Sequence, residues 1–244
     1  MTVNNRNHKP TKKKAPKFLY LSQPSKIECF SFALDIIESG CAERCQYGQS
    51  KVCYVVGNRY RENSPSRKAK KARNFKLANS KDFVRILTSQ IRLTKQRIFR
   101  WFDSGDFFSL EFFKKVMQVC KNFIDKDGKS SVNFWCPTSR DDLLNQYLAE
   151  GGLIPDNVTL RLSAPTPNTP FHKGIIEFYS KWDNITFSET TTDPKLATCH
   201  ASLVEGSSCG DCEDCFSPTH KKTVYAIHGR ANINNMKKYE AELC

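Results

Sequence analysis

Three cysteines lie close together in the first quarter of the sequence, and their spacing suits metal chemistry. The stretch reads Cys-Ala-Glu-Arg-Cys-Gln-Tyr-Gly-Gln-Ser-Lys-Val-Cys, which places thiols at Cys41, Cys45 and Cys53. Four clustered thiolates usually saturate a metal site, whereas three leave one position of a zinc ion, or one iron of a cubane cluster, open to another ligand. Two alternatives stay open at this point: three unrelated thiols, or a four-ligand site completed by Cys29.

A second group of cysteines lies near the C-terminus, at Cys199, Cys209, Cys212 and Cys215. Its C-x2-C-x2-C spacing resembles iron–sulfur ligation more than the two separated C-x2-C pairs of a zinc knuckle. We expect a metal centre with a structural role here, either an iron–sulfur cluster or zinc. His200 and His220 flank the group and are substitute ligands if the metal is zinc.

The remaining cysteines and the composition indicate a reducing compartment. The chain has 244 residues and eleven cysteines, with no apolar run long enough for a membrane span and no secretory signal. We therefore predict a cytoplasmic protein without a membrane partner, in which metal ligation explains the thiols better than disulfides do. Cys120 and Cys136 are predicted core residues, and Cys244 has no evident role.

The positive charge of the chain is uneven. The formal net charge is +13, and basic residues gather in residues 8–17 and 59–76 with almost no acids. Such runs are either a disordered tail and a solvated helix face, or a surface that binds a phosphate backbone and releases its counterions. The second interpretation makes a nucleic acid or nucleotide the partner, bound through residues 59–76 and the N-terminal arm; a host protein is the alternative partner.

Helices and strands are expected to alternate along most of the chain. Apolar residues at helical spacing predict helices over 68–77, 81–94, 110–123, 141–150 and 174–181. Short β-prone stretches predict strands over 97–102, 132–136, 158–162 and 184–187, with 17–22 and 28–34 as candidates before the cysteine loop. About six strands separated by helices form a parallel sheet, which is either an open doubly wound layer or a complete or partial barrel.

Polar residues directly follow several of these strands. They are Asp103, Ser104, Asp106, Thr138, Arg140, Ser163, Glu189 and His228. Because parallel sheets bind ligands beyond the carboxyl ends of their strands, we expect these side chains to line one mouth of the sheet. Each one alone is typical of a turn or a helix cap, so it is their recurrence at one edge that indicates a site.

Four stretches of the sequence carry a family resemblance. They are residues 41–54, Arg100-Trp-Phe-Asp-Ser-Gly-Asp-Phe, Cys136-Pro-Thr-Ser-Arg and the C-terminal Cys-Gly-Asp-Cys-Glu-Asp-Cys-Phe. The combination resembles the phage-encoded gene product 88-like proteins, which in turn resemble the radical S-adenosylmethionine superfamily. This chain has seven residues before its third cysteine, where that superfamily usually has two, and it has no Gly-Gly-Glu motif.

The resemblance implies an α/β fold: a partial (β/α)6 barrel of parallel strands with a C-terminal Cys-rich insertion that binds a cluster. It implies that Cys41, Cys45 and Cys53 hold a [4Fe–4S] cluster whose fourth iron binds S-adenosylmethionine, and that the second cysteine group holds an auxiliary cluster. The expected cofactor-binding residues are Ser104, Gly105, Asp106, Thr138 and Ser163. The expected catalytic residues are Asp106, Arg140, Glu189 and His228. Asp106 is placed to accept a hydrogen bond from the methionine ammonium.

The chain divides into four parts on these grounds. Residues 1–24 are predicted to form a basic flexible arm, and residues 25–198 the partial barrel with the first iron–sulfur loop. Residues 199–220 contain the second cysteine group. Residues 221–244 contain the last strand and a C-terminal helix.

Two functions of different classes follow. The first is an iron–sulfur enzyme of the radical S-adenosylmethionine type that acts on a phosphate-bearing or nucleic-acid-related substrate. The second is a non-catalytic basic phage protein that binds nucleic acid or a host protein, with iron–sulfur or zinc centres that only stabilise the fold. With either function the protein is expected in the cytoplasm. If a phage encodes the chain, this is the cytoplasm of the host cell.

Overall fold

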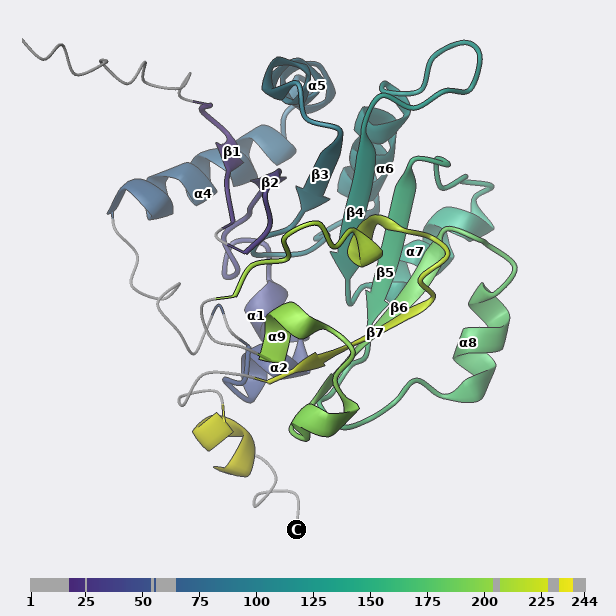
Figure 1. Ribbon diagram of the computed structural model, residues 1–244. Coiled ribbons are helices and arrows are strands. Elements are labelled where there is room, and N and C mark those ends of the chain that lie inside the picture. The colour runs from purple at the N-terminus through teal and green to yellow at the C-terminus, as the bar shows by residue number, and fades with distance from the viewer. Residues whose placement is uncertain are drawn as a thin grey trace, which may run out of the picture.

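Seven strands form one sheet, with helices in the connections between them (Figure 1). The computed structural model describes residues 18–24, 26–53, 55, 65–203, 207–227 and 233–238. The strands are β1 (Leu21–Ser22), β2 (Phe30–Phe32), β3 (Ile98–Trp101), β4 (Asn133–Thr138), β5 (Val158–Ser163), β6 (Ile185–Thr191) and β7 (Lys222–Ala226). The α-helices are α1 (Cys41–Arg44), α2 (Gln46–Gln49), α4 (Pro65–Ala78), α5 (Phe83–Thr94), α6 (Leu110–Lys121), α7 (Asp141–Ala149), α8 (Lys173–Tyr179) and α9 (His200–Leu203). Two short 3-10 helices are η1 (Pro194–Leu196) and η2 (Asp214–Phe216), and residues 233–238 are also helical.

The strands are arranged in the order of the chain, from β1 to β7. β1 pairs antiparallel with β2, and every later neighbour is parallel. A doubly wound sheet reverses its strand order at a switch point, and this order contains no reversal. The described strands do not close into a barrel either, because β1 and β7 each pair on one side only. The structure therefore confirms a mostly parallel α/β sheet, but not the predicted (β/α)6 barrel.

One face of the sheet packs against the helices. Side chains alternate between the two faces of a strand, so Phe99 and Trp101 of β3 point into the main core together with the apolar side chains of α5 and α6. The Trp101 indole nitrogen lies 3.3 Å from Cys120 Sγ inside this core. Cys120 and Cys136 are both fully buried there, which confirms their prediction as core residues.

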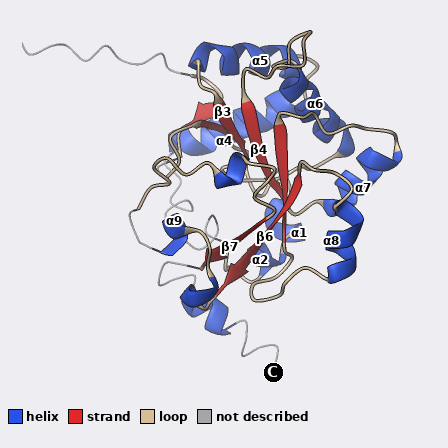
Figure 2. Cartoon of the chain, turned by 45° about the vertical axis from the view of Figure 1, so that its right-hand side comes forward, coloured by secondary structure: helices blue, strands red, loops and turns tan. Residues whose placement is uncertain are grey.

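The opposite face of the sheet, called the polar face below, is lined by Ser31, Arg100, Trp135, Thr159, Arg161, Thr186 and Thr223. The segment that carries the second cysteine group covers this face. Phe216 of η2 packs edge-on against the Trp135 ring at 5.8 Å, and Thr159 Oγ1 donates to the Phe216 carbonyl at 2.7 Å. Figure 2 shows α6, α7 and α8 on one side of the strands and α9 on the other.

Cations of helix α4 anchor the segment around β1. Lys70 Nζ donates to the Leu21 carbonyl at 3.0 Å, and an Arg73 amino group donates to the Leu19 carbonyl at 3.0 Å. Asn74 Nδ2 bridges the carbonyls of the two neighbouring segments, at 3.0 Å to Tyr20 and 2.7 Å to Ala33. Part of the basic stretch 59–76 therefore holds the protein's own backbone.

The elements predicted from residue 81 onward are all present, with limits within a few residues of the expected ones. Both candidate strands before the cysteine loop also form, so the sheet has seven strands where about six were expected. No helix among the described residues is long and apolar enough to cross a membrane. The predicted arm up to residue 17, residues 56–64, His228 and Cys244 lie outside the described residues.

Candidate functional site

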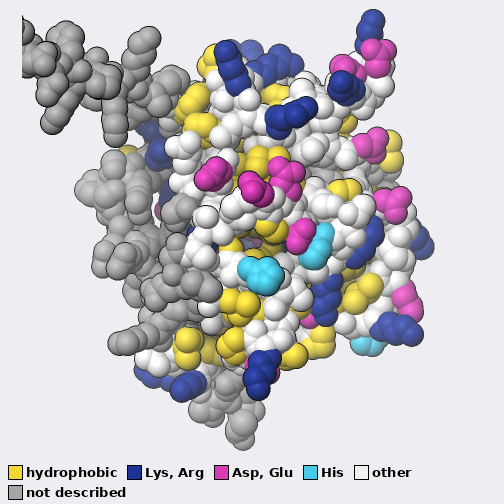
Figure 3. Space-filling model, viewed as in Figure 1, with side chains coloured by type: hydrophobic (Ala, Val, Ile, Leu, Met, Phe, Trp, Pro, Cys, Tyr) yellow, Lys and Arg dark blue, Asp and Glu magenta, His cyan; other side chains and the backbone are white. Residues whose placement is uncertain are grey.

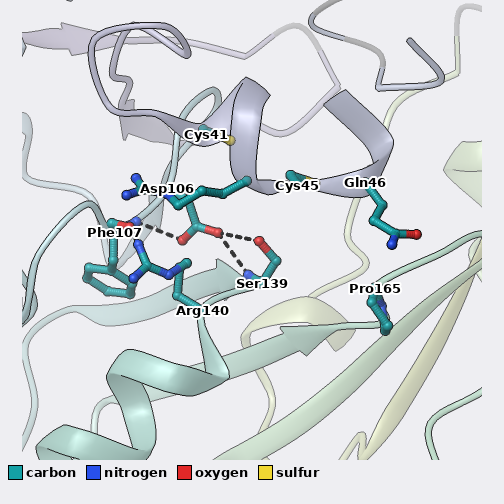
Figure 4. A pocket seen from close by; sticks show the side chains of 9 residues that line it. Cys41, Cys45, Gln46, Asp106, Phe107, Ser139, Arg140 and Pro165 are labelled. Carbon is teal, nitrogen blue, oxygen red and sulfur yellow. Dashed lines mark hydrogen bonds between the residues drawn. The ribbon is translucent and has the colours of Figure 1, made fainter. Parts of the chain in front are cut away.

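A small pocket lies beyond the carboxyl ends of the central strands (Figure 4). Its volume is about 90 Å³. The lining residues come from the cysteine loop and from the loops after β3, β4 and β5: Cys41, Arg44, Cys45, Gln46, Asp106, Phe107, Ser139, Arg140 and Pro165. A volume well below the ~300–1,000 Å³ of ordinary ligand pockets leaves room for a charged head group and not for a whole nucleoside.

Two hydrogen bonds join the loops after β2 and β3. The Leu34 amide donates to the Ser104 carbonyl at 2.9 Å, and Ser104 Oγ donates to the Leu34 carbonyl at 2.9 Å. Gly105 follows with φ of +82°, and a Cβ there would lie 2.7 Å from Leu34 Cβ. The absence of a side chain at this residue allows the two backbones to approach, and it directs Asp106 into the pocket.

The Asp106 carboxylate lines the pocket and accepts four hydrogen bonds. Oδ1 accepts from Thr138 Oγ1 at 2.6 Å and from the Phe107 amide at 2.8 Å. Oδ2 accepts from the Ser139 amide at 2.8 Å and from Ser139 Oγ at 2.9 Å. Burial raises the pKa of this carboxyl, and the four hydrogen bonds act in the opposite direction. They also use its acceptor sites, so a ligand donor has to compete with one of them.

Arg140 lies at the rim of the same pocket and is already paired. Its guanidinium forms a bidentate pair with the Asp142 carboxylate, with both distances at 2.7 Å, and it donates to the Phe107 carbonyl at 2.7 Å. This arrangement holds the loop after β4 against the loop after β3. Arg140 therefore shapes the pocket as well as contributing charge to it.

The cysteine loop places thiols beside Asp106. Burial is the main cause that raises the pKa of Cys41, and the charges of Asp106, Cys45 and Cys53 raise it further. Burial likewise raises the pKa of Cys45, with Cys53 and Asp106 among the additional causes. Cys41 and Cys45 line the pocket together with Asp106, and the Cys53 amide holds that residue to the same short loop through the Tyr47 carbonyl. The structure thus brings two of the thiols and one carboxylate to the same pocket wall.

The end of β6 supports the cysteine loop from another side. The Tyr47 hydroxyl lies 2.8 Å from Thr190 Oγ1, and the Tyr47 carbonyl accepts from the Cys53 amide at 2.8 Å. Glu189 forms an ion pair with Lys222 at 2.7 Å and accepts from the Phe171 amide at 3.3 Å. Glu189 is therefore engaged at this edge, outside the set of residues that line the pocket.

The other predicted mouth residues are distributed over both faces of the sheet. Ser163 lies on the polar face with its hydroxyl 3.3 Å from Ser188 Oγ, and it does not line the pocket. Asp103 lies 3.7 Å from an Arg100 amino group. Asp106, Thr138 and Arg140 are the predicted catalytic or binding residues that the structure brings to one place, whereas His228 lies outside the described residues.

The second cysteine group forms a separate cluster on the polar face. Burial raises the pKa of Cys209, and the charges of Cys215, Cys199 and Cys212 raise it further. Cys215 Sγ lies 3.2 Å from the Tyr225 hydroxyl of β7. The Cys209 amide donates to the Lys26 carbonyl at 2.7 Å, which attaches the cluster to the segment before β2.

Cys29 belongs with this second group, so the alternative in which it completes the first site is wrong. It precedes β2 at the amino end of that strand, whereas the first site lies beyond the carboxyl ends. Cys29 packs with Trp135 and Phe216. Burial raises the pKa of its thiol to about 11, and the charge of Cys209 is among the other causes.

Neither group is arranged around a single ion. In the part of the chain that the structure describes, no three or more His, Cys, Asp or Glu side chains are placed to hold one metal ion. His220 lies 3.9 Å from Asp214, and His200 is exposed.

Sequence reasoning missed several residues of the pocket. Ser139, Phe107 and Arg44 line it, and Tyr47 and Thr190 hold the cysteine loop. The sequence does carry a signal for Ser139, because this residue lies between Thr138 and Arg140, two of the predicted strand-end residues. Arg44 is one turn of α1 away from Cys41, which only the helical geometry reveals.

The fold and the site define a mostly parallel α/β protein with two separate cysteine groups, one at the strand ends and one on the polar face. A family model described as gene product 88 matches residues 1–222. The chain belongs to this family, which bears out the predicted resemblance to phage gene product 88-like proteins. No curated protein and no solved structure matches the chain, and no comparison supports the further resemblance to the radical S-adenosylmethionine superfamily.

Proposed function

We propose that this protein is an iron–sulfur protein of the radical S-adenosylmethionine type, with a three-cysteine [4Fe–4S] site at the pocket and an auxiliary four-cysteine cluster on the polar face. The observation that carries the proposal is the pocket at the carboxyl ends of parallel strands, where Cys41 and Cys45 lie with Asp106 and Cys53 follows in the same loop. The sequential strand order supports a further proposal, that the open sheet is a partial (β/α)6 barrel.

The donor sets fit a cluster better than a single ion. A zinc ion needs all its thiolates within about 2.3 Å of one point, whereas a cubane distributes its cysteines over separate irons. The C-x2-C-x2-C spacing of Cys209, Cys212 and Cys215 favours iron–sulfur ligation, with zinc in the second site as the alternative.

The pocket residues suit the two charged ends of an amino acid. Arg44 brings a guanidinium to the wall beside Cys41 and Cys45, where it can pair with a carboxylate. Asp106 offers a buried carboxylate to an ammonium group. The ammonium has to replace a hydroxyl donor, because hydroxyls can rotate away while the backbone amides cannot. Ser139 Oγ is the less constrained of the two hydroxyls, since Thr138 Oγ1 also accepts from the Arg140 amide at 3.0 Å.

When bound, a reduced cluster supplies the electron that cleaves S-adenosylmethionine. The chain's own residues bind and orient the methionine head group and exclude water. Phe107 and Pro165 provide apolar surface beside the charged groups. Because the pocket is small, the adenosine and the substrate have to lie outside it, along the mouth formed by the strand-end loops.

A phosphate-bearing or nucleic-acid-related substrate remains part of the proposal, with the net charge of +13 in its support. Part of the described positive charge is engaged by the protein's own backbone, however. Lys70 and Arg73 hold backbone carbonyls. On the face that Figure 3 shows, the described Lys and Arg side chains are scattered, and Asp and Glu side chains lie among them.

Replacing Cys41, Cys45 and Cys53 together by serine should remove one cluster and leave the other. Anaerobically purified wild-type protein is expected to contain about eight irons and to absorb visible light, because each cubane holds four. The triple variant should retain about half of this iron. Iron and acid-labile sulfide content, measured together with the absorption spectrum, check the prediction.

Two matched variants complete this experiment. Replacing Cys199, Cys209, Cys212 and Cys215 should remove the other half of the iron, and Cys244→Ser should remove none. A protein that contains zinc and no iron would instead favour the structural zinc alternative, and a protein that contains neither metal would contradict both. Binding of S-adenosylmethionine without cleavage under strong reductant would restrict the proposal to a non-catalytic cluster.

A further inference from the structure

Arg161 is a buried cation on the polar face of the sheet. It lies in the middle of β5, where its neighbours Leu160 and Leu162 point into the main core, and its side chain is fully buried. One amino group donates to the Phe187 carbonyl at 3.1 Å and to Thr223 Oγ1 at 2.6 Å. The other donates to the carbonyls of Asp214 at 3.0 Å and His220 at 3.2 Å.

All four of these acceptors are neutral. Among the residues that the structure describes, none of the ion pairs includes Arg161, and its Nε has no hydrogen-bond partner. An arginine stays protonated in proteins, so its charge cannot be avoided by loss of a proton. A buried charge without a counter-charge is strongly unfavourable. A negative charge close to Arg161 would therefore stabilise the folded protein.

The second cysteine group is the neighbour that can provide it. The bond to the Asp214 carbonyl places the guanidinium beside the next residue, Cys215. Cys215 Sγ lies 3.2 Å from the hydroxyl of Tyr225 in β7, the strand that also carries Thr223. A second orphan donor lies on the same face, because the buried Trp135 indole nitrogen also has no hydrogen-bond partner.

We propose that Arg161 is the charge-compensating residue of the centre held by Cys199, Cys209, Cys212 and Cys215. Four thiolates around a divalent ion or a cubane keep a net negative charge, which the buried guanidinium neutralises. The same side chain fixes the position of the loop, since it holds the carbonyls on both sides of the last ligand, at Asp214 and His220. The inference rests on the proposed metal centre in this group but not on the first site or on catalysis.

Arg161→Gln and Arg161→Lys in the full-length protein separate charge from hydrogen bonding. Glutamine keeps donors without the charge, and lysine keeps the charge without the fork of donors. Arg161→Gln should lower the affinity of the second site for its metal by about 10- to 100-fold, as for other residues that support metal ligands. Arg161→Lys should retain most of the affinity. The measurement is the release of iron or zinc to a competing chelator, made in protein whose first site carries serines.

A control variant replaces an arginine elsewhere in the fold. Arg73→Met removes a partly buried arginine that also donates to a backbone carbonyl, far from the cysteines, and should leave metal release unchanged. If the centre is iron–sulfur, Arg161→Gln should also make its midpoint potential more negative, since a positive charge favours uptake of an electron. Equal metal loss in the lysine and glutamine variants, or wild-type affinity in the glutamine variant, would overturn the inference. A wild-type second site without metal would contradict the proposed function itself.

Discussion

Gly105→Ala is expected to destabilise the protein by about 2–5 kcal/mol. Two costs add at this residue. Its φ of +82° lies in the left-handed region, where a side chain costs about 1–2 kcal/mol. In addition, the new Cβ would lie 2.7 Å from Leu34 Cβ and 3.3 Å from the Leu34 carbonyl oxygen, so the two loops have to separate. Urea denaturation measures the change.

Gly128→Ala is the matched control for this prediction. Gly128 has a φ of +78°, and a Cβ there would have no neighbour within 4 Å. Gly128→Ala should therefore lower the free energy of unfolding only by the cost of the left-handed backbone conformation, about 1–2 kcal/mol. The difference between the two variants isolates the close approach of the loops after β2 and β3. Equal losses would mean that the loop contact contributes nothing to stability.

Asp106→Asn should cost about 3 kcal/mol at neutral pH, because it places an amide donor opposite donors that are buried. Oδ2 now accepts from the amide and the hydroxyl of Ser139, and an NH2 group cannot accept from either. Asp142→Asn is the control, since Asp142 is half-exposed at the rim of the same pocket and its pair with Arg140 should contribute at most about 1 kcal/mol. A stable Asp106→Asn variant would contradict the role of this carboxylate as the link between β3 and β4.

The same substitution should also change the pH dependence of stability in metal-free protein. Burial raises the folded-state pKa of Asp106 above its ordinary value of 3.8. At pH values between 3.8, the pKa in the unfolded state, and the higher pKa of the folded state, the folded protein binds more protons than the unfolded protein. The contribution of Asp106 to the free energy of unfolding therefore falls as pH rises through this range. Asp106→Asn removes this decline. The stability difference between wild type and variant should therefore be larger at pH 4 than at pH 7, and denaturation at a series of pH values checks the sign.

Local sequence patterns determined the secondary structure and the fold class. Helices α5, α6 and α7 carry apolar residues at helical spacing, and β3, β4 and β5 are short β-prone runs, so each pattern is complete within its own element. Alternation of strands with helices then required parallel pairing. The first strand before the cysteine loop was less clear, because β1 has only two residues and is held in place by β2 and by the hydrogen bonds of α4.

The sequence also determined which residues end the strands, but not which of these ends meet. Asp106, Thr138 and Arg140 come together because β3 and β4 are neighbours with adjacent carboxyl ends. Ser163 is the last residue of the next strand, β5, and its side chain points to the polar face because side chains alternate along that strand. Strand order and the direction of each last residue are properties of the assembled sheet.

The cysteines show the same division most clearly. Their spacing alone identified two groups that could bind metal centres, and it gave Cys41, Cys45 and Cys53 one position open to another ligand. Only the tertiary structure placed Cys29 with the second group, brought Asp106 beside the first, and buried Arg161 next to Cys215. These contacts join residues far apart in the chain, and the crossovers that bring them together leave no trace in the local sequence.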